Sequence, residues 1–513
     1  MGIEPRLRIV LAAAPTSLDP HQHNFAPNQS VAFHLYEPLV WRDGGGQRQP
    51  LLAQDWQETA PRRWSLQLRP GLRFQDGRPL TARDAVYSYC RAQAMQGDRL
   101  SFAPLLRDIA GIAAPAPDRL VFDFRRRFSE LPYALAGIVI VAAPAEFPAG
   151  ALWRPGGCTD AAGRPLAWPA ESGLPVGSGP YRLAAAPDGA GLTSLPLRRN
   201  EAYWGSPPAW PNILLTVIED DQRRIRALGN GNADLVEQVP PGSVAALRSG
   251  GFTVLSAPAN RLMHLQMEQQ RDALPDLQDT GGRNPFRDLR VRRAISLGID
   301  RPALVERVMG GFAIPVWQLV RDDMEGYAPG MTAGYDPAEA RRLLAEAGYG
   351  GGFAVRLLAP DGRYANDRRI AEAVGAMLLP LGIRVTVEAQ PPAEFFTIRA
   401  RERAAFFLAG NAISTASTAV RALALAPDPA HGRGTSNHGD FRDPEVDRLY
   451  DQAMAASEPA DQDRLMAAAN RRASEQLAVI PLFYGQTLWG LRPGLAMEPR
   501  LDQLTLATGL RPQ

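Results

Sequence analysis

The sequence predicts a mixed α/β protein built from more than one domain. Three observations lead to this: the length of the chain, an alternation of short strands with a helix in its C-terminal half, and helix-start signals that recur along it. With 513 residues the chain exceeds one ordinary hydrophobic core, and 45% hydrophobic with 21% charged residues is typical of a folded globular protein.

The N-terminal half begins with strand signals. The apolar run 9–14 predicts a first strand, which a Pro-Thr-Ser loop ends. In "RRWSLQLRPGLRF" (62–74) apolar residues alternate and a Pro-Gly turn follows, which indicates one strand of a hairpin. Thr81 then caps a helix, with Asp84 in its first turn. A β-rich block is expected over 47–174.

The C-terminal half carries two further helix starts and a βαβ pattern. Asp336 and Asp443 each precede a proline at the first helical position, and an acidic residue follows in the first turn. The β-rich runs 351–360 and 382–389 flank a helix expected at 370–381. This alternation is typical of parallel strands joined by a crossover helix.

A glycine-rich loop, "VGSGPYRL" (176–183), could cradle a phosphate or mark a turn into a strand. Because Tyr181 starts a strand, no helix N-terminus is available to face a phosphate. The chain has no lysine, so a P-loop is impossible. We predict a structural turn, in which Gly177 and Gly179 let the backbone turn sharply and Pro180 fixes φ.

Signals of catalytic or metal chemistry are missing. There is no GxSxG, HExxH or SxxK motif, and the six histidines never stand four residues apart. His21 and His23 could share a metal if their segment were extended, or be ordinary loop histidines. Cys90 and Cys158 are compatible with one disulfide or with two buried thiols. The sequence therefore predicts no catalytic residue, no metal site and no cofactor.

Charge and hydropathy limit the partners. A net charge of +2, with the 56 basic residues scattered among acids, does not favour a nucleic-acid binder. No window of about 18 apolar residues could span a membrane. The N-terminal apolar run is too short for a secretory signal. If the protein is exported, the signal is expected to have been removed already.

Five ordered stretches together resemble one family. They are "LRPGLRFQDGRPLTARDAVYSYCRA", "VGSGPYRL" with "RRNEAYWGSPP", "NPFRDLRVRRAISLGIDRPALVERVMGG", "DPAEARRLLAEAGYGGGF", and "DPEVDRLYDQAM" with "VIPLFYGQTLW". The chain resembles, from residue 7 to its C-terminus, the solute-binding proteins of ABC importers for peptides, nickel, opines and related solutes.

The resemblance implies a type II periplasmic-binding-protein fold. Two lobes joined by a two-crossing hinge, near Arg261 and Tyr484, would close over a ligand in the cleft between them. The implied parts are a first lobe of 1–46, 175–262 and 485–513, an inserted extra domain of 47–174, and a second ligand-binding lobe of 263–484.

In peptide-binding relatives an aspartate beside a tryptophan pairs with the peptide's amino terminus. Here the matching stretch, from Ala404 to Pro427, has no acid and no tryptophan. An ammonium group buried without a counter-charge costs several kcal/mol. Neutral hydrogen bonding in this stretch would instead suit sugars, amides or modified amino acids. The alternative is that its small polar residues only form a helix start.

The resemblance also suggests which residues contact the ligand. Arg321 could hold a ligand carboxylate bidentately, or pair at the surface with Asp322 or Asp323. The candidate ligand-binding residues are His23, Asn24, Phe25, Phe102, Trp317, Gln318, Arg321, Asn411, Ser414, Thr415, Ser417, Asn437, His438, Tyr484 and Gln486.

The function expected is that of a periplasmic solute-binding protein of an ABC importer. It would capture a peptide-like, opine-like or sugar-like organic solute and deliver it to the permease subunits, as a monomer, without catalysis and without nucleic acid. One alternative is a nickel or metal-chelate binder that uses His21, His23 or His438. Another is a hydrolase of exported glycoconjugates, which no motif supports.

Overall fold

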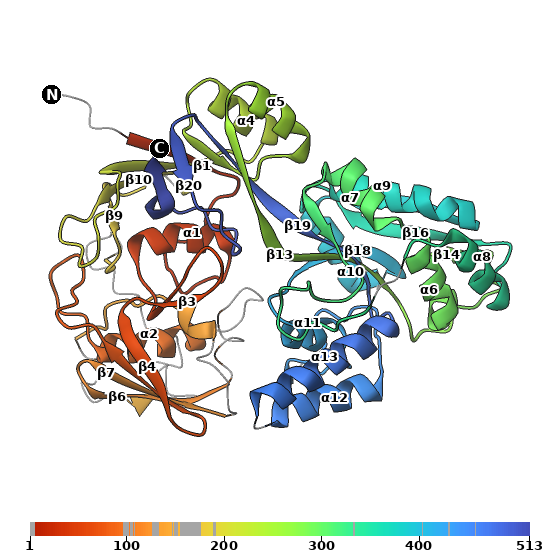
Figure 1. Ribbon diagram of the computed structural model, residues 1–513, viewed down its shortest axis with the longest axis horizontal. Coiled ribbons are helices and arrows are strands. Elements are labelled where there is room, and N and C mark those ends of the chain that lie inside the picture. The colour runs from red at the N-terminus through yellow and green to blue at the C-terminus, as the bar shows by residue number, and fades with distance from the viewer. Residues whose placement is uncertain are drawn as a thin grey trace. The chain divides into compact units, whose positions relative to one another are not determined.

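The chain folds into two compact units (Figure 1). Unit 1 comprises Met1–Ala257 and Thr487–Gln513, and unit 2 comprises Pro258–Gln486. The computed structural model describes residues 6–95, 102, 106, 108–125, 133–145, 147, 152–153, 176–187, 191–331, 334–402, 404–428, 431–456 and 458–513.

Two long strands carry the chain from one unit to the other. They are β13 (Thr253–Met267) and β19 (Ile480–Leu491). The expected crossings near Arg261 and Tyr484 fall within these strands. The division into two units does not separate residues 47–174 from the rest of unit 1, so the inserted domain stays a prediction.

Among its described residues, unit 1 contains two larger sheets, two two-stranded sheets and several helices. Its elements are β1 (Arg6–Leu11), α1 (Ala26–Leu35), β2 (Val40–Arg42), β3 (Arg48–Pro50), β4 (Ala53–Ala60), β5 (Arg63–Leu68), α2 (Ala82–Ala94), β6 (Ile109–Ala116), β7 (Arg119–Phe124), β8 (Leu152–Trp153), β9 (Tyr181–Leu183), β10 (Ser194–Arg199), β11 (Asn212–Val217), α4 (Asp221–Gly229), β12 (Leu235–Glu237), α5 (Val244–Ser249), β20 (Leu495–Met497) and β21 (Leu510–Pro512). One sheet has the order β12-β1-β11-β10-β9, with β1 parallel to both neighbours. The other has the order β4-β5-β7-β6-β8, and its apolar face packs with α2 in one core.

Unit 2 is a sheet with helices on both faces. Its elements are β14 (Leu277–Gln278), α6 (Leu289–Leu297), α7 (Arg301–Met309), β15 (Ala313–Pro315), α8 (Pro337–Glu346), β16 (Phe353–Pro360), α9 (Asp367–Leu378), β17 (Ile383–Gln390), α10 (Pro392–Glu402), β18 (Phe406–Ala412), α11 (Ala416–Leu423), α12 (Pro444–Ala455) and α13 (Pro459–Glu475). Side chains alternate along β13: Met263 and Leu265 enter the core with α6 to α9, while Leu262 enters the core with α11 to α13.

The local sequence signals are confirmed. Thr81 and Asp84 form a capping box at the start of α2. Asp336 and Asp443 accept backbone hydrogen bonds at the starts of α8 and α12. The βαβ pattern is also confirmed, because β16 and β17 pair in parallel on either side of α9.

The glycine loop before β9 is structural, but for a reason other than the one expected. Neither Gly177 nor Gly179 has a positive φ. A Cβ at Gly177 would overlap the carbonyl oxygen of Leu35, and one at Gly179 would lie 2.6 Å from the carbonyl carbon of the same residue. The glycines therefore allow a close approach to the end of α1, not a sharp turn.

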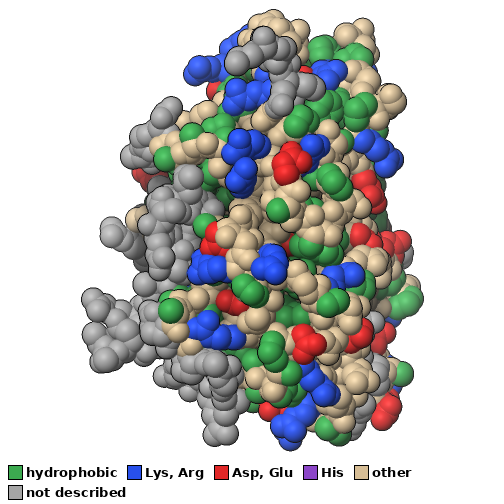
Figure 2. All heavy atoms as spheres, turned by 90° about the vertical axis from the view of Figure 1, so that its left-hand side faces the viewer, with side chains coloured by type: hydrophobic (Ala, Val, Ile, Leu, Met, Phe, Trp, Pro, Cys, Tyr) green, Lys and Arg blue, Asp and Glu red, His purple; other side chains and the backbone are tan. Residues whose placement is uncertain are grey.

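The charged surface shown in Figure 2 is mixed. On that face arginine side chains alternate with acidic and apolar ones and do not gather into one patch. Among the described helices, none is both long and apolar enough to cross a membrane.

Candidate ligand-binding site

The candidate site is an edge of the unit 2 sheet at which parallel strands end. β16 is parallel to β17 and β18, so the loops after Pro360 and Ala412 leave the sheet at the same edge. Arg261 on β13 pairs with Ala412 and lies at this edge too. Ligands of open α/β sheets bind beyond the carboxyl ends of strands. We call the loop 361–366, the segment 412–415 and Arg261 the carboxyl edge of unit 2.

A buried carboxylate fixes the loop 361–366. Asp367 accepts hydrogen bonds from the backbone N–H groups of Gly362, Arg363 and Tyr364 at 3.2, 2.9 and 3.0 Å. Backbone donors thus occupy the carboxylate. The side chains of Arg363 and Tyr364 consequently project from an anchored backbone.

The ring of Tyr364 lies against β18 at Gly410, which has no side chain. A Cβ on Gly410 would come within 3.0 Å of two ring carbons of Tyr364 and within 2.8 Å of Met263 Sδ. The Tyr364 hydroxyl donates to the Gly410 carbonyl at 3.0 Å. Glycine makes room for the ring, and the hydrogen bond orients it.

Two arginines flank this ring. The Cζ atoms of Arg261 and Arg363 each lie 5.4 Å from the ring centroid of Tyr364, within cation–π range. Arg261 is part-buried and Arg363 is exposed. Within the described part of the chain, neither guanidinium has a hydrogen bond or an ion pair. Burial lowers the pKa of Arg261; Tyr364 opposes this, and the like charge of Arg363 adds to it.

The polar segment after β18 is used largely to start α11. Thr415 Oγ1 accepts from Thr418 N at 3.2 Å, and Thr418 Oγ1 accepts from Thr415 N at 3.1 Å and from Ser414 N at 3.3 Å. This is the helix-start role that the sequence offered as the alternative. Ser417 is part-buried, and among the described residues its hydroxyl has no hydrogen-bond partner.

The side chain of Asn411 is hydrogen-bonded to other residues of unit 2. Its Oδ1 accepts from His264 Nε2 at 2.9 Å, and its Nδ2 donates to Ser436 Oγ at 3.0 Å. Burial lowers the pKa of His264 to about 4, which keeps the ring neutral at pH 7. A ligand would find this amide already engaged.

Three of the predicted contact residues are buried and serve the fold. Gln318 exchanges hydrogen bonds with the backbone of Ala328 at 2.9 and 3.0 Å. Asn437 does the same with Phe441 at 2.8 and 2.9 Å. Phe102 is 1% exposed and belongs to the core that contains α2. All three side chains thus serve the packing of their own unit, and their roles as ligand contacts stay predictions.

Arg321 is paired, and the pair is buried on the arginine side. Its Nε and Nη2 donate to the carboxylate of Asp323 at 2.9 and 3.0 Å, and Nη1 donates to the Ala259 carbonyl at 3.0 Å. Its Cζ lies 5.0 Å from the ring centroid of Tyr484, whose hydroxyl donates to the Leu319 carbonyl at 2.6 Å. A ligand carboxylate would have to displace Asp323, so we no longer assign that role to Arg321, and buried Tyr484 is likewise engaged.

Three other candidates of unit 2 remain accessible. Trp317, His438 and Gln486 are part-buried. The backbone N–H of His438 donates to Gln266 Oε1 at 3.0 Å, which fixes the loop rather than the ring. These three stay predictions.

In unit 1 the predicted loop precedes α1. His23 Nδ1 lies 2.6 Å from Thr16 Oγ1, and Asn24 Oδ1 accepts from Gln29 Nε2. Phe25 is part-buried at the start of the helix. Their roles as ligand contacts also stay predictions.

Of the residues considered for a metal or a disulfide, His21 is engaged by the backbone and Cys90 takes part in a disulfide. His21 is buried, with Nε2 2.8 Å from the Val139 carbonyl oxygen, and burial lowers its pKa to about 4. Among the described residues, no group of three or more His, Cys, Asp or Glu could hold a metal ion. Cys90 is disulfide-bonded. Cys158 lies outside the described residues.

The sequence analysis missed Arg261, Arg363 and Tyr364. A signal existed for the last two, because they follow the strand predicted at 351–360 and so stand at a carboxyl end. No local signal marks Arg261, since its place depends on the register between β13 and β18.

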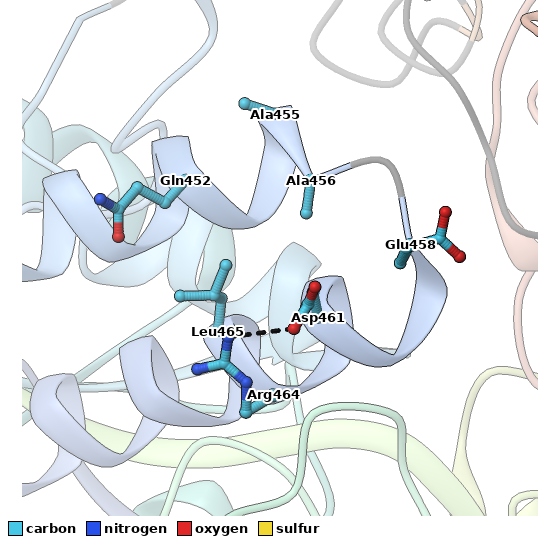
Figure 3. Close-up of a pocket in the computed structure, with 7 residues that line it drawn as sticks. All are labelled: Gln452, Ala455, Ala456, Glu458, Asp461, Arg464 and Leu465. Atoms are coloured by element: carbon cyan, nitrogen blue, oxygen red, sulfur yellow. Dashed lines mark hydrogen bonds and ion pairs between the residues drawn. The ribbon is translucent and has the colours of Figure 1, made fainter.

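A pocket elsewhere in unit 2 lacks the features of a ligand site. Figure 3 shows it between the end of α12 and the start of α13, with a volume of about 360 Å³. Arg464 Nη2 donates to Asp461 Oδ1 across one turn at 3.1 Å, so its arginine is already neutralised. We assign no ligand to it.

Comparison with known proteins identifies the family. Residues 47–424 match the family model described as bacterial extracellular solute-binding proteins, family 5 Middle. The glutathione-binding protein GsiB of Shigella boydii serotype 4 is 25% identical over 480 residues, which is 91% of this chain and 86% of the relative.

Solved structures show the same fold. AgaA from A. tumefaciens R10, in complex with agropinic acid, has a TM-score of 0.74 at 21% identity and 99% coverage of both chains. CtaP from Listeria monocytogenes, an ABC transporter substrate-binding protein, has a TM-score of 0.80 at 16% identity and the same coverage. The type II periplasmic-binding-protein fold expected from the motifs is therefore confirmed. The chain belongs to the bacterial extracellular solute-binding proteins of family 5, the ABC-importer class that its five sequence stretches resemble.

Proposed function

We propose that the protein captures an organic solute without a free α-amine, such as a blocked or modified peptide or an opine, for an ABC importer. One observation carries this proposal: residues 404–427 contain no acid and no tryptophan, and the side chains of Asn411 and Thr415 in this stretch are engaged in neutral hydrogen bonds. A buried ammonium would have no counter-charge from this stretch.

The finer assignments belong to the same proposal. The protein acts in the periplasm, as a monomer, and hands its solute to permease subunits without transforming it. Membership of a solute-binding family and the lack of a nucleophile motif in the sequence support these points.

The test is a ligand panel measured by thermal shift. The protein is denatured and refolded first, to remove any solute carried through purification. The panel holds free di- to pentapeptides, their N-acetylated forms, opines, glutathione, oligosaccharides and nickel–histidine. A ligand specific for the folded state adds about 2.7 kcal/mol of stability at a hundredfold excess over its Kd, which raises Tm measurably.

We expect N-acetylated peptides or opines to raise Tm more than the matched free peptides. The reverse order would contradict the proposal and require an acid from another segment. Glu325 would then be the first residue to substitute, because its carbonyl accepts from Ala416 N at the start of α11. A shift with nickel–histidine alone would support the metal-chelate alternative.

A further inference from the structure

We propose that Arg261, with Arg363 and Tyr364, forms a subsite at the carboxyl edge of unit 2 that binds a carboxylate group of the solute. This inference rests on the proposed function, because it adds an anionic group to a solute that lacks an α-amine. The residues that carry it were not among the contacts expected from the sequence.

The first step is the cost of an unpaired cation. Arg261 is part-buried, and within the described chain no acid and no carbonyl oxygen accepts from its guanidinium. Its charged neighbour is Arg363, of the same sign. Taking a charge out of water without compensation is unfavourable, so such a group indicates a partner that is bound only part of the time.

The second step is that two other buried arginines of unit 2 find carbonyl acceptors for their terminal nitrogens or Nε. Arg301 donates to the carbonyls of Pro481 and Ser296 at 2.7 and 3.0 Å. Arg292 donates to the carbonyls of Phe286 and Gln476 at 2.8 and 2.9 Å. Arg301 and Arg292 thus each donate to at least two carbonyl oxygens, whereas Arg261 has no such acceptor among the described residues.

The third step is the geometry of the guanidinium. Arginine stacks on an aromatic ring with its face and donates hydrogen bonds from its edge, where the N–H fork matches a carboxylate. The Cζ atom of Arg261 lies over the Tyr364 ring, 5.4 Å from its centroid, and the Tyr364 hydroxyl is fixed on Gly410. Among the described residues no acceptor occupies the N–H groups of Arg261, and Arg363 adds a second positive charge on the same ring.

The experiment compares a solute with and without its carboxylate. The probes are an N-acetylated dipeptide and its C-terminal amide, titrated into the refolded protein by calorimetry. The variants are wild type, Arg261→Met, and Arg293→Met as a control that removes an exposed arginine of the same unit. Far-UV circular dichroism and Tm of the ligand-free variants check folding.

We expect the acid to bind wild type about 10- to 100-fold more tightly than the amide, the range of a charge-assisted hydrogen bond. Arg261→Met abolishes this difference, and Arg293→Met retains it. Equal binding of acid and amide by wild type overturns the subsite but leaves the proposed function intact. A third outcome is that only peptides with a free amino terminus bind, and that amidation of their carboxyl group weakens binding to wild type but not to Arg261→Met. This outcome overturns the proposed function and retains the subsite.

A second arm of the experiment replaces the peptides with simple anions. Tm is measured in acetate, chloride and inorganic phosphate at equal ionic strength. We expect acetate to raise the Tm of wild type above its value in chloride, and Arg261→Met to lose that increment. Identical responses of wild type and Arg261→Met overturn the proposal. A larger Arg261-dependent response to phosphate assigns the subsite to an inorganic anion and also overturns it.

Discussion

Two arginine–tyrosine pairs in unit 2 have the same components and different surroundings. Arg321 lies 5.0 Å from the Tyr484 ring centroid, and Arg261 lies 5.4 Å from that of Tyr364. Arg321 is held by Asp323 and by the Ala259 carbonyl, two residues before Arg261 on the same strand. Arg261 has no such acceptor among the described residues. The presence or absence of an acid therefore separates a structural cation from one that is available to a solute.

The largest expected effect comes from removing the acid that pairs with Arg321. Asp323→Ala leaves the buried guanidinium of Arg321 without its half-exposed carboxylate, and we expect the free energy of unfolding to fall by about 3 kcal/mol, the lower end of the range for a buried charge that loses its partner. Urea denaturation measures the change. Asp322→Ala, which removes an exposed neighbouring acid, is the matched control and should stay within about 0.5 kcal/mol of wild type. Equal losses in both variants would show that the pair does not stabilise unit 2.

Unit 1 offers the complementary case of a buried acid that has no ion pair among the described residues. Glu37 accepts from the Tyr203 hydroxyl at 2.7 Å and from Trp204 Nε1 at 2.9 Å. Burial raises its pKa to about 7 from an ordinary 4.5, although both hydrogen bonds work against that rise. The folded state therefore holds a proton that the unfolded state releases between these two pH values.

The sign of the pH dependence follows from this. The contribution of Glu37 to stability is complete below pH 4.5 and is lost as pH rises to about 7, a fall of about 3 kcal/mol. Glu37→Gln cannot ionise, so we expect this part of the slope to disappear from urea midpoints measured across that range. Glu219→Gln, at an exposed position, should retain the wild-type slope. An unchanged slope in Glu37→Gln would assign the pH dependence to another group.

The sequence was sufficient for whatever depends on neighbours along the chain. Thr81, Asp336 and Asp443 start helices as expected, because a cap needs only the next three residues. The family followed from ordered motifs. The acceptors of most other side chains are set by tertiary structure, however, and these decided the site. Arg321 is an exception, because it pairs with Asp323 two residues further on, which is the pairing that the sequence offered as the alternative to a ligand carboxylate.

Arg261 was missed for the opposite reason. Its neighbours at the carboxyl edge come from residues 363, 364 and 412, which are about 100 to 150 positions away along the chain. The capping residue Thr415 shows a third limit, because by sequence alone the same hydroxyl could serve a helix cap or a ligand.

The smallest expected change in stability, that of Arg261→Met, distinguishes Arg261 from Arg321 most clearly. In the ligand-free protein Arg261→Met removes a part-buried cation that has a like-charged neighbour, and methionine fills similar space. The loss of stacking on Tyr364 and the relief of the desolvated charge oppose each other, so stability should stay within about 1 kcal/mol of wild type, with Arg293→Met as the control. Urea denaturation of refolded, ligand-free protein measures this. A loss as large as that of Asp323→Ala would mean that Arg261 holds the fold together as Arg321 does, and the two pairs would no longer differ. A near-neutral change in stability, combined with lost discrimination between acid and amide, is the result that only a solute-binding arginine produces.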